Sequence, residues 1–393
     1  MKKITFVIPS RNNLELLKLS YKSIRRLKGE HEILVLDDAS EDGTGDWLNS
    51  LEDDNLVVHT NPGPDRVGIV GMFDKGIEMA TTDIIFAFHA DMVAGPNLDE
   101  NILKHLDKGK VVSATRVEPP LHPPGPEKIT MNFHIGKECE AHNFDWDGFY
   151  DWAENVGLNN TKTTEGVFAP WCMYKEDFLA VGGHDELFAP QSKEDSDLFN
   201  RFVLNGYKVL QTWEGLVYHF TSRGSRFNKH AGGGAGQNSQ EWIYTTTKNM
   251  RNFIRKWGSV VKHDSLMKPI ISPKYDIGII VRNCRQEVIQ ALEPWCNTFY
   301  TDPSLIKEYV NFEQPNTIID LSKKVLGYKK EINNDIMVEI DANIFNNKDF
   351  EYIQQLPDIL KDSGTEGSFQ LGNLKITIKA LNTFEQKLIK NDD

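Results

Sequence analysis

The sequence has few cysteines, no long apolar run and no basic excess. Its four cysteines form no CxxC pair and lack the spacing of a zinc site, so we expect buried or inert free thiols. No apolar run approaches the roughly 20 residues needed to cross a bilayer. The N-terminus also lacks a signal region with a cleavage site. We therefore expect a cytoplasmic protein without a transmembrane segment.

The charge balance bears on the kind of partner. A net charge of −13 argues against a nucleic-acid partner, because no dominant basic face is visible. A local basic cluster could still hold a small anionic ligand. Hydrophobic residues make up 39% and charged residues 26%, which is typical of a soluble globular protein. A length of 393 residues allows one large domain plus a smaller one, or two domains of ordinary size.

The first part of the chain alternates between strand and helix patterns. Apolar runs and helical spacings predict strands at 4–8, 32–36, 56–59 and 84–88, with helices at 14–24 and 70–80. Strands that alternate with helices predict an α/β fold with a doubly wound, mostly parallel sheet and flanking helices.

Later segments differ in composition. Residues 117–165 are irregular and rich in aromatics, which could wall a pocket or simply pack together. Residues 221–240 read as a glycine-rich loop, and 243–257 as a helix. Pro269 and Pro273 mark a boundary, so we expect domains at 1–262 and 270–393, the second a smaller α/β domain of unknown role.

Polar residues follow two of the predicted strands. Asp37 and Asp38 end the second strand, where they could accept hydrogen bonds from a nucleoside or simply cap a helix. His89 and Asp91 follow the run at 84–88. Because ligands of open α/β sheets bind outside the carboxyl ends of the strands, these residues form a candidate metal pair; the alternative is a capped strand.

Two further motifs come later in the chain. Glu194 and Asp195 open a predicted helix, a position that acidic residues also favour because of the helix dipole. His219 ends a strand-like run ahead of the glycine-rich loop. A lone histidine is more often structural than a ligand.

The order of these motifs resembles that of family 2-type glycosyltransferases of the GT-A fold. The resemblance covers roughly residues 1–260. It rests on the segments FVIPSRN at 6–12, VLDDAS at 35–40, HAD at 89–91, VGGHDE at 181–186, KEDSDL at 193–198 and FIRKWG at 253–258.

The resemblance implies a divalent metal that stabilises the diphosphate of a nucleotide-sugar donor. Asp91 matches the direct metal ligand, and His219 matches the second protein ligand. His89 replaces the usual leading aspartate of the motif, so it could contact metal, ribose or neither. Mn²⁺ is the first choice and Mg²⁺ the second, because Mn²⁺ tolerates imidazole more readily.

The resemblance also assigns donor-binding residues. Pro9, Arg11, Asp37 and Asp38, together with His89, would border the nucleotide. Arg223, Arg226 and Lys229 could close over the diphosphate as a lid, or could form a solvated basic loop.

For catalysis, the resemblance implies an inverting transfer with Asp195 as the base. Glu194 would orient the acceptor or Asp195. Trp171, Asp185 and Glu186 are candidate acceptor contacts, with core or turn roles as alternatives. The chain lacks the Gln-x-x-Arg-Trp signature and the membrane helices of processive synthases, which favours transfer of a single sugar. We expect the donor to be a UDP-sugar and the acceptor to be a glycan or another hydroxyl compound.

Three other functions remain possible. One is a retaining transferase on the same fold. A nucleotidyltransferase is disfavoured because no glycine-rich loop follows the first strand. A non-catalytic carbohydrate-binding protein is disfavoured by the complete acidic set. The acceptor, the linkage and the oligomeric state are open at this level.

Overall fold

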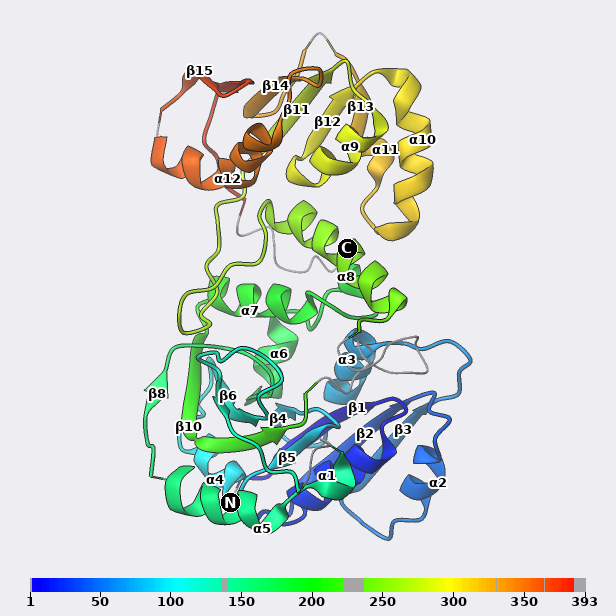
Figure 1. Ribbon diagram of the computed structural model, residues 1–393, viewed down its shortest axis with the longest axis vertical. Helices are drawn as coiled ribbons and strands as arrows, with labels where there is room; N and C mark the ends of the chain where they lie inside the picture. Colours follow the sequence, from blue (N-terminus) through cyan, green and yellow to red (C-terminus); the bar gives the residue numbers. More distant parts are fainter. Residues whose placement is uncertain are drawn as a thin grey trace. The chain divides into compact units, whose positions relative to one another are not determined.

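The computed structural model describes residues 2–135, 140–157, 159–221, 237–329, 331–363 and 365–384. The chain divides into two compact units (Figure 1). The first consists of Met1–Thr245 and His263–Pro269, and the second of Thr246–Lys262 and Ile270–Asp393. Each unit contains its own β-sheet.

The sheet of the first unit follows the order β3-β2-β1-β4-β9-β6-β10-β5, with β7 beside β6 and β8 beside β10. The strands are β1 (Thr5–Ser10), β2 (Glu32–Asp38), β3 (Leu56–Asn61), β4 (Ile84–Ala87), β5 (Met92–Ala94), β6 (Lys110–Glu118), β7 (Lys128–Thr130), β8 (Thr163–Thr164), β9 (Trp171–Tyr174) and β10 (Lys208–His219). Strands β1–β4 pair in parallel and β6 pairs in parallel with β10, whereas β9 and β5 run antiparallel to their neighbours. The predicted α/β architecture with a mostly parallel sheet is confirmed.

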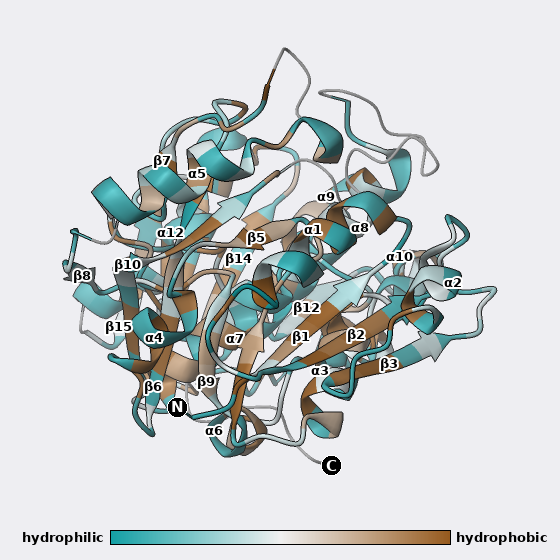
Figure 2. Cartoon of the chain, turned by 90° about the horizontal axis from the view of Figure 1, so that it is seen from below, coloured by the Kyte–Doolittle hydropathy of each residue, from teal (hydrophilic) through white to brown (hydrophobic). Residues whose placement is uncertain are grey.

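Helices pack on this sheet. They are α1 (Leu14–Ile24), α2 (Thr44–Asn49), α3 (Ile69–Met79), α4 (Leu98–Leu103), α5 (Trp146–Trp152), α6 (Lys175–Ala180) and α7 (Glu194–Leu204). The central strands β2 and β4 are buried along their whole length, which explains their uninterrupted apolar runs. In Figure 2 strand β2 is largely brown, that is hydrophobic, whereas helix α5 is largely teal.

The aromatic residues of segment 117–165 pack into a core. Phe133, Phe144 and Phe149 are buried in one hydrophobic cluster with Tyr218 and Phe220. Tyr218 and Phe220 flank His219 at the end of β10. These aromatic side chains therefore pack together instead of lining a pocket. Their hydrophobic cluster supports the strand that carries His219.

The second unit has the strand order β13-β12-β11-β14-β16-β15, parallel except at β15 and β16. Its elements are β11 (Ile277–Arg282), α9 (Gln286–Leu292), β12 (Thr298–Thr301), α10 (Pro303–Glu313), α11 (Leu321–Lys324), β13 (Val325–Gly327), β14 (Ile336–Asp341), α12 (Asn347–Ser363), β15 (Gly367–Leu371) and β16 (Leu374–Ile378). A smaller α/β fold was expected for this part of the chain. Its cysteines Cys284 and Cys296 are free thiols, as is Cys172 of the first unit.

Helix α8 (Gln240–Trp257) belongs to both units, because the division falls after Thr245. Its C-terminal turns join the second unit through a buried ion-pair network. Arg255, which is 4% exposed, lies 2.7 Å from Glu293 and 2.5 Å from Glu313. A buried guanidinium destabilises the fold unless it is paired. The ion pairs of Arg255 with the two carboxylates therefore hold this part of α8 in the second unit. Among the described residues, no helix is long and apolar enough to cross a membrane.

Candidate functional site

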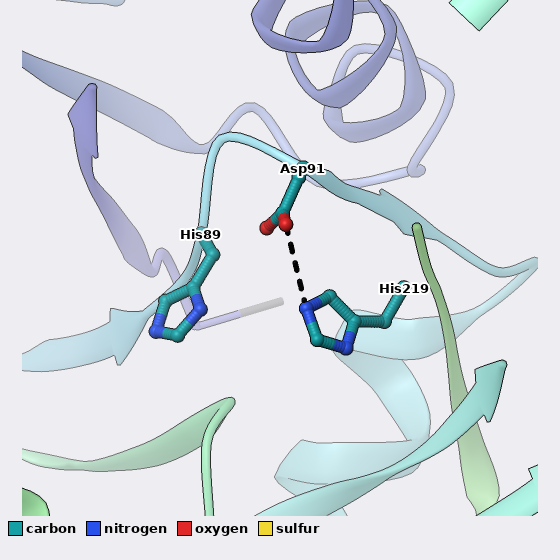
Figure 3. Close-up of side chains that lie close together, drawn as sticks. All are labelled: His89, Asp91 and His219. Atoms are coloured by element: carbon teal, nitrogen blue, oxygen red, sulfur yellow. Dashed lines mark ion pairs between the residues drawn. The ribbon is translucent and has the colours of Figure 1, made fainter. Parts of the chain in front are cut away.

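Three potential metal ligands meet at the carboxyl end of β4. His89 and Asp91 lie on the short connection between β4 and β5, and His219 ends β10 (Figure 3). Their ligand atoms all lie within 4.8 Å of one another, and His219 Nε2 lies 3.5 Å from an Asp91 carboxylate oxygen. Two imidazole nitrogens and one carboxylate oxygen at this spacing suit a divalent transition metal.

Antiparallel pairing of β5 with β10 brings the distant His219 to this point. In the register of these strands, His219 lies opposite Met92, the residue after Asp91. The Phe220 amide donates a hydrogen bond to the Asp91 carbonyl at 3.0 Å, which extends the pairing by one residue. The two segments are therefore fixed to each other by main-chain hydrogen bonds, and their side chains need little rearrangement to share one ion.

Burial and mutual charge set the protonation of the cluster. Burial lowers the pKa of His89 more than Asp91 raises it, which favours the neutral imidazole that binds metals. Burial raises the pKa of Asp91, but His219 and His89 outweigh it, so the pKa falls below its ordinary value. The cluster thus contains an ionised carboxylate with a lone pair available to a cation.

Glu118 also contacts the cluster, and the sequence analysis missed it. It is the last residue of β6, and its Oε1 lies 2.8 Å from His219 Nδ1. Burial raises the pKa of Glu118, but the hydrogen bond from His219 and the charge of Arg116 outweigh it and lower the pKa to about 2. Its sequence signal was an acidic residue at the carboxyl end of a strand.

A cleft of about 470 Å³ opens beside the cluster and shares His89 and Asp91 with it. Pro9, Arg11 and Asp38 also line it, so five predicted site residues meet at this cleft. The cleft is also lined by Asp65, Arg66, Gln191 and Glu241, to which no sequence motif points. Arg66 and Glu241 form an ion pair there.

The two aspartates at the end of β2 have different environments. Both are buried, but Asp38 lines the cleft, whereas Asp37 is absent from the described lining residues. The Asp38 carboxylate accepts hydrogen bonds from the Val67 and Gly68 amides, each at 2.8 Å. Gly68 has φ +92°, and a Cβ there would lie 2.4 Å from the Cβ of Pro190, so this wall of the cleft requires glycine. Asp38 thus orders the loop before α3.

The acidic pair Glu194 and Asp195 begins α7. It follows Ser192 and Lys193, whose φ values of +79° and +75° are unfavourable for residues with a side chain. Asp195 is half-buried, and its charge acts on the His89 imidazole. Glu194 is buried, and its Oε2 has no hydrogen-bond partner among the described residues. Burial, followed by the charge of Asp195, raises the pKa of Glu194 to about 8.

This raised pKa predicts a pH-dependent difference between the wild type and Glu194→Gln. The ordinary pKa of glutamate is 4.5, so between about pH 4.5 and 8 the folded protein binds the proton more tightly than the unfolded chain. The contribution of Glu194 to stability is present below pH 4.5 and is lost as the pH rises through 8. The melting temperature of the glutamine variant should equal that of the wild type near pH 4.5 and exceed it at pH 8.5. The difference should be about 2–4 °C for each kcal/mol by which the free energies of unfolding of the two proteins differ.

The matched control is Glu186→Gln, because Glu186 is an exposed carboxylate in the preceding segment. Its melting temperature should follow that of the wild type at both pH values in thermal unfolding experiments. A Glu194→Gln difference that stays constant from pH 4.5 to 8.5 would contradict the raised pKa.

The three candidate acceptor contacts lie in different environments. Trp171 is 1% exposed and packs against Phe178 and Phe202, so of its two interpretations the structure favours the core role over a sugar contact. Asp185 is half-buried and accepts a hydrogen bond from the Leu187 amide at 2.9 Å, while Glu186 is exposed. Arg223, Arg226 and Lys229 lie outside the described residues.

Residues 5–152 match the family model described as glycosyl transferase family 2. Over these residues the chain carries a family 2 glycosyltransferase domain. This confirms the family and the enzyme class that the motifs indicate. Residues 164–226 also match the model described as chondroitin N-acetylgalactosaminyltransferase.

One relative is an undecaprenyl-phosphate mannosyltransferase from Micrococcus luteus. It is 28% identical over 238 residues, which cover 60% of this chain and 90% of that protein.

Solved structures are similar at lower identity. A mannosyltransferase from Pyrobaculum calidifontis, in complex with GDP-Man and Mn²⁺, is 17% identical with a TM-score of 0.42, covering 65% of this chain and 63% of that one. GalNAc-T7 with UDP, GalNAc and Mn²⁺ is 12% identical with a TM-score of 0.41, covering 55% and 43%. The glycosyltransferase thus spans less than two thirds of the length of either structure.

Proposed function

We propose that this glycosyltransferase is metal-dependent and inverting, and that it moves a single sugar from a nucleoside-diphosphate donor to an acceptor hydroxyl. The observation that carries the proposal is the cluster of His89, Asp91 and His219 at the edge of the cleft. A donor in the cleft would have its diphosphate within reach of a cation bound by the cluster. The family 2 match supplies the reaction class.

Asp91 and His219 are the proposed metal ligands, with His89 as the third. A bound divalent ion would offset the negative charge that builds on the diphosphate as the glycosidic bond breaks. Two imidazoles and one carboxylate favour Mn²⁺ over Mg²⁺, because Mg²⁺ prefers oxygen ligands and several waters. Mn²⁺ is therefore the proposed ion.

Pro9, Arg11 and Asp38 are the proposed nucleotide contacts, since they line the cleft next to the cluster. Asp38 already binds two main-chain amides, so it orders the cleft wall as well as offering a carboxylate to the nucleoside. Asp37 is proposed to act indirectly: it accepts a hydrogen bond from the Ser40 amide at 3.3 Å, in the turn that follows β2.

Asp195 is the proposed base. It takes the proton from the acceptor hydroxyl while that oxygen bonds to the anomeric carbon, and the nucleoside diphosphate leaves with the electrons of the broken C–O bond. Below pH 8 the neighbouring Glu194 is protonated, so it adds no second negative charge beside Asp195. Glu194 is proposed to orient Asp195 or the acceptor, and Asp185 and Glu186 to contact the acceptor.

The donor is proposed to be a UDP-sugar. The matched regions point to two sugars worth testing first. The N-acetylgalactosaminyltransferase model covers the segment with Glu194, Asp195 and His219, and the 28% identical relative is named as a mannosyltransferase. N-acetylgalactosamine and mannose donors therefore belong in the first panel.

The test combines donor screening with metal removal. Thermal shift with UDP, GDP and their sugars should show stabilisation only when Mn²⁺ is present, because a ligand that binds only the folded state raises the melting temperature. EDTA should abolish donor hydrolysis and transfer, and Mn²⁺ should restore them. Turnover that persists in EDTA would contradict the metal dependence, and NMR of the product anomer would distinguish inversion from retention.

A further inference from the structure

We infer that Glu118 is a positioning residue that orients His219 for metal binding. The inference rests on the metal site proposed above. The observation behind it is a direct contact: Glu118 Oε1 lies 2.8 Å from Nδ1 of His219, and the other ring nitrogen, Nε2, faces Asp91. No motif of the sequence analysis includes Glu118.

Strand pairing places the two residues together. Strands β6 and β10 are parallel, and Val117 pairs with Tyr218 in their register. Glu118 and His219, each the next residue along, therefore meet at the carboxyl ends of neighbouring strands. The contact is built into the sheet and does not depend on a loop.

Two cations hold the Glu118 side chain in place. Arg116 Nε lies 3.1 Å from Oε1, and Lys128 Nζ lies 3.0 Å from Oε2. The Glu118 side chain is 4% exposed, so the carboxylate has little freedom to turn away from His219. Paired and buried in this way, Glu118 keeps its charge at low cost.

The hydrogen-bonding capacity of Glu118 and His219 determines which ring nitrogen of His219 carries a hydrogen. A carboxylate only accepts hydrogen bonds, so Nδ1 of His219 must carry the hydrogen. When a metal is bound, Nε2 then presents its lone pair toward Asp91 and His89. A carboxylate on the far ring nitrogen of a metal-binding histidine fixes the tautomer and the ring plane, and its loss typically costs about 10–100-fold in metal affinity.

The test is calorimetric titration of the full chain with Mn²⁺, first without nucleotide. Glu118→Ala and Glu118→Asp should both weaken Mn²⁺ binding by about 10–100-fold. The aspartate keeps the charge but is one methylene too short to reach Nδ1, so it separates positioning from simple electrostatics. Glu127→Gln is the matched control: Glu127 also pairs with Arg116, at 3.1 Å, and should change the affinity less than threefold.

Wild-type affinity in Glu118→Asp would overturn the positioning role. Because a buried carboxylate could be needed for folding, thermal unfolding of each variant is measured first. If Glu118→Ala does not fold, the Mn²⁺ affinity of Glu118→Asp and the His219 tautomer of the wild type test the inference. ¹⁵N NMR of the Zn²⁺-loaded wild type should show the Nδ1–H tautomer at His219. The opposite tautomer would refute the inference. If Asp91→Asn binds Mn²⁺ as the wild type does, the proposed metal site itself fails, which is a distinct outcome.

Discussion

Replacement of Asp195 by asparagine should lower kcat by about 10²–10⁴-fold, the range that a positioned general base contributes. The amide keeps the shape of the side chain but cannot accept the proton of the acceptor hydroxyl. Asp195 is half-buried in the first turn of α7, and the two residues that precede this helix have positive φ values. The substitution should leave the fold intact. Steady-state kinetics with the donor found in the panel would measure the effect.

Donor binding separates this role from a general loss of structure. The Kd of UDP with Mn²⁺ should stay within about threefold of the wild type in Asp195→Asn, because a base acts on the acceptor rather than on the diphosphate. Glu176→Gln, at an exposed carboxylate on α6, is the control for removal of one acidic group. Full turnover in Asp195→Asn would refute the assignment of the base.

Replacement of Asp91 by asparagine should weaken Mn²⁺-dependent binding of UDP by more than about 100-fold, beyond the loss typical of outer-shell partners. Asp91 is the only carboxylate of the described metal cluster, so its removal leaves two imidazoles and a neutral amide to hold a divalent ion. Calorimetric titration of UDP with and without Mn²⁺ gives the metal-dependent part of the affinity. Catalysis should fall with it.

Asp65→Asn is the matched control, because Asp65 is a carboxylate of the same cleft that lies outside the cluster. Its metal-dependent change in affinity should stay below about fivefold, since Asp65 is exposed and salt screens the charge of an exposed group. Equal losses in Asp65→Asn and Asp91→Asn would show that the cleft responds to charge in general, and would count against a metal at the cluster.

Local patterns predicted the elements well. The apolar runs and helical spacings gave β1, β2, β3, β4, α1 and α3, because a strand buried on both faces and an amphipathic helix each leave a periodic trace in sequence. The sequence also pointed to the three residues of the cluster: His89 and Asp91 because they follow a buried strand, and His219 through the family resemblance.

Non-local pairing decided what the sequence could not. Trp171 and the aromatics near Phe149 look alike as residue types, and only packing shows that they are core. Glu118 resembles any acidic residue at a strand end until the pairing of β6 with β10 sets it against His219. Arg66 and Glu241 lie far apart in the sequence but form an ion pair in one cleft.

The sequence alone thus determined the α/β alternation, the family and the order of the chemical groups along the chain, because these depend on residue type and short-range spacing. The tertiary structure decided which groups meet. Asp38 lines the cleft and its likewise buried neighbour Asp37 does not, since successive side chains of a strand point to opposite faces. His219 joins His89 and Asp91 through the pairing of β5 with β10, because main-chain hydrogen bonds between distant strands fix a register that composition does not encode.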